Sequence, residues 1–100
     1  MRITQPPSTL STWPVIQRIR DAGLRYCPHY LGAGIGLLAS AQVLAAAGGD
    51  GLLEVDANPN ALRSGLAPML DHVVDGRVSL GEGPGLGVDV DLARARALCG

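Results

Sequence analysis

The chain has 100 residues, 47% of them hydrophobic, and a formal net charge of −1 at pH 7. This apolar content is typical of a globular protein rather than a disordered one, and the length allows at most one domain. All the basic residues are arginines spread along the chain, and without a basic stripe we expect neither nucleic acid nor an anionic membrane as a partner.

The N-terminal part predicts a loop, a helix and a short strand. Residues 1–11 are rich in Pro, Ser and Thr, which predicts an extended piece and a loop. A helix entered through Pro14 should follow, capped by a hydroxyl residue just before it and ended by Gly23. Residues 24–27 then fit a short strand.

The middle of the chain predicts a buried helix and a second strand. Residues 35–47 are apolar on nearly all sides, so a helix there should be packed between other elements. The glycines of 48–51 end it, and residues 52–55 fit the next strand. The whole apolar run, 31–47, is shorter than the roughly 20 residues that a membrane span needs, so no membrane partner is expected.

The C-terminal part predicts a hairpin, a glycine-rich loop and a helix. Asp75-Gly76 stands between two short β-prone runs, which is a hairpin signal. Glycine dominates residues 81–87, and Asp91 should cap a terminal helix. Cys27 and Cys99 lie far apart, and no signal peptide is recognisable, so we expect reduced thiols and a cytoplasmic location.

His29, a run of glycines and two acidic residues form the candidate site, and the residues alone leave three interpretations. The first is a dinucleotide site, because Gly-x-Gly at 32–34 lies between a strand and a helix and Asp56 follows about 20 residues later. The third glycine of that fingerprint is replaced by Leu37. The second interpretation is structural: the glycines permit close helix packing and the carboxylates of Glu54 and Asp56 are solvated.

The third interpretation is an acid/base site at the ends of neighbouring strands. It predicts an α/β fold, part of a (β/α)8 barrel, with His29 after one strand and Glu54 on the next. A histidine and a carboxylate that face the same cavity can exchange a proton with a substrate. Glu54 favours this interpretation, because an acidic residue within an apolar strand is costly to bury unless it is paired or used.

Three motifs resemble one known family. They are CPHYLGAGIGLLASA at 27–41, LEVDANPN at 53–60, and Asp-Gly-Arg-Val followed by Gly-Pro-Gly-Leu-Gly-Val within 75–88. Together they resemble the C-terminal end of the mandelate racemase/muconate lactonizing enzyme group of the enolase superfamily. The resemblance covers nearly the whole chain. One departure is Pro7, which stands where members of the group carry an aspartate after a Gln-Pro pair.

The resemblance implies an architecture in two parts. Residues 1–70 would form the last two to three βα units of the (β/α)8 barrel. Residues 71–100 would be a hairpin, glycine-rich loop and terminal helix that return to the capping domain. The metal-binding carboxylates and the lysine base of the group would belong to earlier strands, before Met1.

The resemblance also implies roles for four residues. His29 would be a catalytic base and Glu54 the acid that hydrogen-bonds the substrate carboxylate, while Tyr30 and Asp56 would contact the substrate. The parental reaction would be Mg²⁺-assisted proton abstraction next to the carboxylate of a hydroxy or sugar acid, ending in racemisation or dehydration.

We therefore interpret the chain as a C-terminal fragment of such an enzyme, inactive alone and with no metal ligands or cofactor of its own. The alternatives are a small non-catalytic interaction module and, ranked below it, a dinucleotide-binding βαβ unit. Exposed strand edges would also allow self-association.

Overall fold

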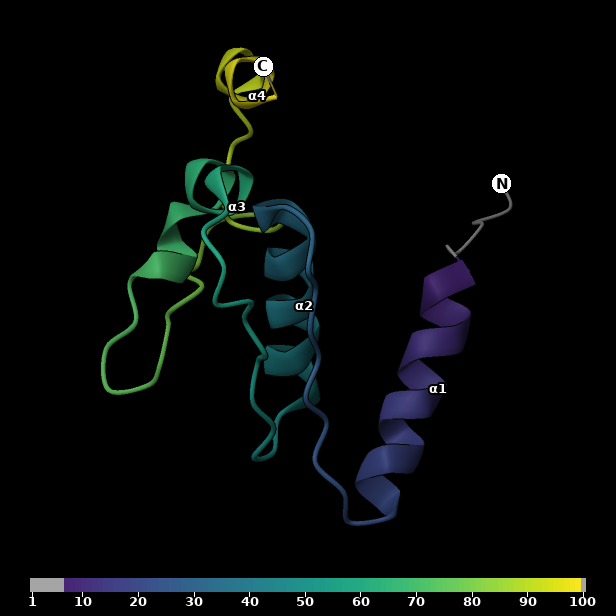
Figure 1. Cartoon of the computed structure of the whole chain (residues 1–100). Helices are drawn as coiled ribbons and strands as arrows, with labels where there is room; N and C mark the ends of the chain where they lie inside the picture. Colours follow the sequence, from purple (N-terminus) through teal and green to yellow (C-terminus); the bar gives the residue numbers. More distant parts are fainter. Residues whose placement is uncertain (1–6, 100) are drawn as a thin grey trace.

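The computed structural model of the chain describes residues 7–99, with side chains from residue 12 onwards. Within that range the elements follow one another as α1 (Pro7–Asp21), α2 (Gly34–Ala47), α3 (Ala61–Leu66), the 3-10 helix η1 (Pro68–Asp71) and α4 (Leu92–Leu98). Figure 1 shows α1 standing apart, while α2 and α3 lie together in the main body. In this described part, no helix is both long enough and apolar enough to cross a membrane.

Helix α1 begins earlier than the sequence predicts. It starts at Pro7 and contains Pro14, so the loop expected over residues 1–11 is wrong from residue 7 onwards, and residues 1–6 lie outside the described residues. Proline suits the first helical position, because its missing N–H would have no partner there. The helix ends as predicted at Gly23, whose φ is 74°. The Gly23 N–H donates to the Arg20 carbonyl at 2.9 Å, a bond typical of a helix C-terminus.

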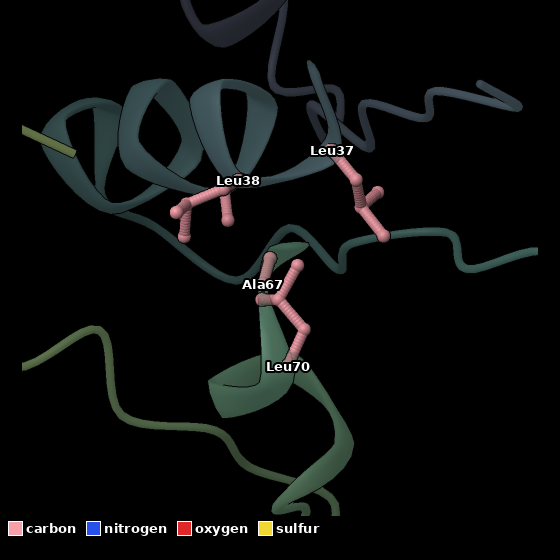
Figure 2. Packing of buried hydrophobic residues seen from close by; sticks show 5 residues of the cluster. Leu37, Leu38, Ala67 and Leu70 are labelled. Carbon is pink, nitrogen blue, oxygen red and sulfur yellow. The ribbon is translucent and has the colours of Figure 1, made fainter. Parts of the chain in front are cut away.

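The main core lies between α2 and η1. Figure 2 shows Leu37 and Leu38 on α2 directed toward Ala67 and Leu70. Together with Ala41 these side chains form one buried cluster. Partly buried side chains pack against it, Met69 from η1 and the others from loops: Leu53, Met69, Val78, Leu80, Leu86 and Val88. The core is therefore a thin layer of aliphatic side chains beneath a single helix.

Helix α2 is buried along one stripe and again at Ala47, which lies near its C-terminal end on another side. Its fully buried positions in the core, 37, 38 and 41, follow helical spacing and form one stripe. Ile35, Val43 and Leu44 lie off this stripe and remain partly exposed. The helix at 35–47 is thus confirmed, but the expectation that it is packed between other elements holds only for this stripe and for Ala47.

Gly34 lets the start of α2 approach α3 closely. A Cβ added to Gly34 would lie 2.6 Å from the Arg63 carbonyl oxygen and 2.9 Å from the Ala67 Cβ. Both distances are well below ordinary van der Waals contact, and one of the two atoms belongs to the backbone. This position therefore requires glycine for packing.

Two extended segments, 25–29 and 50–54, run side by side in a fixed register. The Arg25 Nε donates to Asp50 Oδ2 at 3.1 Å, and the Leu52 N–H donates to Cys27 Sγ at 3.4 Å, each pair being 25 positions apart. The same offset pairs His29 with Glu54 in a parallel β-bridge. The segments thus keep one alignment over their whole length.

The predicted partial (β/α)8 barrel is wrong. Over residues 7–99 the chain forms helices and two isolated β-bridges but no strand. The pairing of 25–29 with 50–54 has one bridge, with the Glu54 N–H donating to the Pro28 carbonyl at 2.9 Å. Each parallel strand normally has ladder partners on both sides and helices on both faces. Here the Leu52 N–H donates to the Cys27 Sγ instead of to a backbone carbonyl. Pro28 has no N–H to donate.

The C-terminal part turns at Asp75-Gly76, where both residues have positive φ, 52° and 72°. Val74 and Arg77 exchange two backbone hydrogen bonds of 2.8 and 3.0 Å across this turn, a geometry that suits a two-residue turn. Asp91 caps α4 as predicted, accepting from the Arg94 N–H at 3.1 Å. The division into parts 1–70 and 71–100 stays a prediction.

We predict that Gly34→Ala destabilises the chain by about 1–3 kcal/mol, because the new methyl group would overpack the contact between α2 and α3. The matched control is Gly36→Ala in the same helix. Its Cβ would meet the half-exposed ring of Tyr30, which can rotate away, so we expect a change below about 1 kcal/mol. Urea unfolding followed by circular dichroism measures both, and equal effects would contradict the packing argument.

We also predict that stability falls at alkaline pH because of Tyr26. Burial raises the pKa of Tyr26 above its ordinary value of 10.0, so above that pH the unfolded chain releases the phenol proton before the folded one does. The contribution is fully present below about pH 10 and is lost as the pH rises through the folded pKa. Tyr26→Phe should remove this fall in urea unfolding measured at increasing pH. Tyr30→Phe is the control, and a fall that persists in Y26F would assign it to another group.

Candidate functional site

His29 and Glu54 are brought together by the backbone. They are the bridged pair of the two extended segments, which places their side chains next to each other along one parallel pairing. His29 lies between α1 and α2, and Glu54 lies between α2 and α3. The sequence predicts this proximity, and the bridge supplies a structural reason for it.

Both side chains are exposed. Among the described residues, neither forms a hydrogen bond or ion pair through its side chain. An exposed imidazole can take up or deliver a proton, and a carboxyl group can accept or donate a hydrogen bond according to its protonation. The arrangement can therefore serve acid/base chemistry on a small molecule that reaches both groups.

The Tyr30 ring lies against the start of α2. A Cβ on Gly32 would lie 2.7 Å from the Tyr30 Cε1, and one on Gly36 would overlap the same ring. The ring thus occupies the space over the glycines where a pyrophosphate would have to approach the backbone. This packing argues against a dinucleotide site at Gly32–Gly36.

The Asp56 carboxylate is turned into its own loop. Its Oδ1 accepts hydrogen bonds from the Asn58 backbone N–H at 3.0 Å and from the Asn58 Nδ2 at 2.8 Å. This is a local turn in which the acidic side chain fixes the loop that follows Glu54. The structure thus shows Asp56 organising the loop, and its contact with substrate stays a prediction.

Asn60 and Arg63 contribute to the site although the sequence analysis did not select them. The Arg63 guanidinium donates to the carbonyls of Asp56 and Asn58 at 3.0 and 3.1 Å. Asn60 accepts from the Arg63 N–H at 3.1 Å and caps α3. An asparagine directly before Ala-Leu-Arg is an N-cap signal that could have revealed this short helix.

The residues do not fit a magnesium ion. Within residues 7–99, no three side chains of His, Cys, Asp or Glu type are grouped so that they could hold a metal ion. Mg²⁺ prefers several oxygen ligands in octahedral geometry. We therefore derive no chemical step through a metal for this chain.

A separate open cleft of about 650 Å³ lies at the C-terminal end of α2. It is lined by residues of 44–53 and by the turn at 75–78. Tyr30, next to His29, lies at the opposite end of the helix, against Gly32 and Gly36. The cleft and the histidine are therefore different features of the surface.

The chain matches known proteins in two comparisons. The family model described as enolase C-terminal domain-like matches residues 12–95. A crystal structure of a mandelate racemase/muconate lactonizing enzyme from Bordetella bronchiseptica RB50 has 61% sequence identity and a TM-score of 0.79, over 86% of this chain. None of the curated proteins compared with the chain matches it.

The match covers 24% of the length of the Bordetella protein, so the chain corresponds to about a quarter of that enzyme. Both comparisons agree with the resemblance carried by the motifs at 27–41, 53–60 and 75–88. The chain therefore belongs to the enolase C-terminal domain-like family and is similar to part of a mandelate racemase/muconate lactonizing enzyme.

Proposed function

We propose that this chain supplies the His29 and Glu54 pair of an enzyme that removes the proton next to the carboxylate of a hydroxy or sugar acid. The observation that carries the proposal is the parallel bridge that sets these two exposed residues side by side. The product would be the racemised acid or the dehydrated one. Two free exposed thiols, Cys27 and Cys99, agree with the cytoplasm as the location.

Each residue has a proposed role. The His29 imidazole removes the proton from the carbon next to the substrate carboxylate, or returns a proton to that carbon in the later step. Glu54 hydrogen-bonds the substrate carboxylate through its acid form and so fixes the distance between substrate and imidazole. Tyr30, whose side chain is exposed, and Asp56 would contact the rest of the acid.

The metal of such a reaction would be held elsewhere. Since the described residues do not fit Mg²⁺, we assign this chain a share in binding and proton transfer and no share in metal binding. The isolated chain should accordingly show no turnover, and its activity should depend on a larger partner protein.

A second candidate function, a non-catalytic interaction module, is supported by the exposed surface. The accessible area is 7456 Å², against about 5,400 Å² expected for a folded monomer of this mass. Leu24, Leu31 and Leu52 are each 64–65% exposed. A large accessible area and exposed leucines are features that a surface for another protein would present.

We predict that the two functions separate in a complementation assay. The chain is mixed with the part of the Bordetella enzyme outside the matched quarter, and exchange of the α-proton of mandelate and of sugar acids is followed by NMR in D₂O with Mg²⁺. The wild-type mixture should exchange the proton, while His29→Asn should lower the rate at least about 100-fold, the usual contribution of a general base.

The control variant is His72→Asn, which changes the other histidine and should leave the rate within about twofold. Glu54→Gln should weaken substrate binding as well as the rate. Formation of a tight complex without proton exchange would favour the interaction module. Equal rates for wild type and H29N would rule out His29 as the base.

A further inference from the structure

The loops that follow His29 and Glu54 are tied to each other by one side chain. The Asn60 Nδ2 donates to the Gly32 carbonyl at 3.1 Å, which links the loop after Glu54 to the loop after His29. The Asn60 Oδ1 accepts from the Arg63 N–H at 3.1 Å. The Asn60 side-chain amide thus caps α3 and also binds Gly32, a residue 28 positions earlier in the chain.

Arg63 holds the rest of the loop in the same place. Its guanidinium donates to the carbonyls of Asp56 and Asn58 at 3.0 and 3.1 Å, and its Nε is buried. The backbone of Arg63 lies against Gly34, where even a methyl group would not fit. Residues 56–63 therefore form one hydrogen-bonded unit fixed to the start of α2.

We propose that Asn60 is a positioning residue for the His29 and Glu54 pair, an inference that rests on the proposed function of that pair. The backbone between the two segments offers a single bridging hydrogen bond, from the Glu54 N–H to the Pro28 carbonyl. The Asn60 amide joins the two loops that follow these segments, because it donates to the Gly32 carbonyl. Together with the Arg25–Asp50 and Leu52–Cys27 hydrogen bonds, these two bonds oppose sliding or separation of the segments.

The two polar atoms of the Asn60 side chain have separate roles. The oxygen belongs to the α3 cap and the nitrogen to the link with Gly32. Asn60→Asp keeps the oxygen acceptor at a helix N-terminus, where a carboxylate is stabilised, but has no donor for the Gly32 carbonyl. This substitution therefore removes the link and preserves the cap.

The test is amide hydrogen exchange of the full chain by ¹⁵N NMR, in the wild type, N60D and N60A. In N60D, we expect the Glu54 amide to exchange about fivefold faster, since one hydrogen bond of ordinary strength is lost. The amides of Leu38 and Ala41 in α2 should keep their rates. In N60A, the α3 amides should accelerate as well, because the cap is lost too.

The matched control is Asp91→Ala, which removes an equivalent cap at α4, where Asp91 accepts from the Arg94 N–H at 3.1 Å. It should leave the Glu54 amide unchanged. An unchanged Glu54 amide in N60D would overturn the proposal. Equal acceleration at Glu54 and Leu38 would overturn it as well, because it would mean only a general loss of stability. The readout needs no substrate, so it stands apart from the complementation assay and can succeed or fail independently of it.

Discussion

The parallel alignment of 25–29 with 50–54 is the constraint from which the candidate site follows. A chain can return to the start of an extended segment only if the intervening element spans the same length. Helix α2 has 14 residues, or about 21 Å, and six extended residues such as 24–29 span about 20 Å. Because both segments are extended and rise equally per residue, the offset of 25 is the same at Arg25 and at Cys27 and brings His29 to Glu54.

The same alignment explains the surface that the structure leaves open. One bridge satisfies one amide and one carbonyl, whereas the outer edges of both segments keep their remaining polar groups in water. On α2, the stripe through Leu37 and Leu38 is covered, while Val43 and Leu44 are only partly covered. The two extended segments thus keep unpaired backbone groups, and α2 beside them keeps partly exposed apolar side chains. The charge pair of Arg25 and Asp50, with both side chains mostly exposed, adds little stability.

Local signals were predicted well and the long-range arrangement less well. The apolar run at 35–47, Gly23 and the cap of Asp91 act within a few residues, and all three are where the sequence places them. The barrel was wrong because strand patterns become strands only when neighbours complete the ladder. The proximity of His29 and Glu54 follows from element order, whereas Asn60 was missed because its second bond, to Gly32, reaches 28 positions back along the chain.

The glycines show why spacing alone left the function open. Gly34 serves the contact between α2 and α3, while Gly32 and Gly36 make room for the Tyr30 ring. A nucleotide loop would use the same residue type to bring backbone amides to a phosphate, and nothing in the spacing separates these uses. The two uses are distinguished by the atoms that a Cβ would contact at each glycine. At Gly34 the neighbour is a carbonyl of the chain itself, and at Gly36 it is an aromatic ring, so this glycine run serves packing.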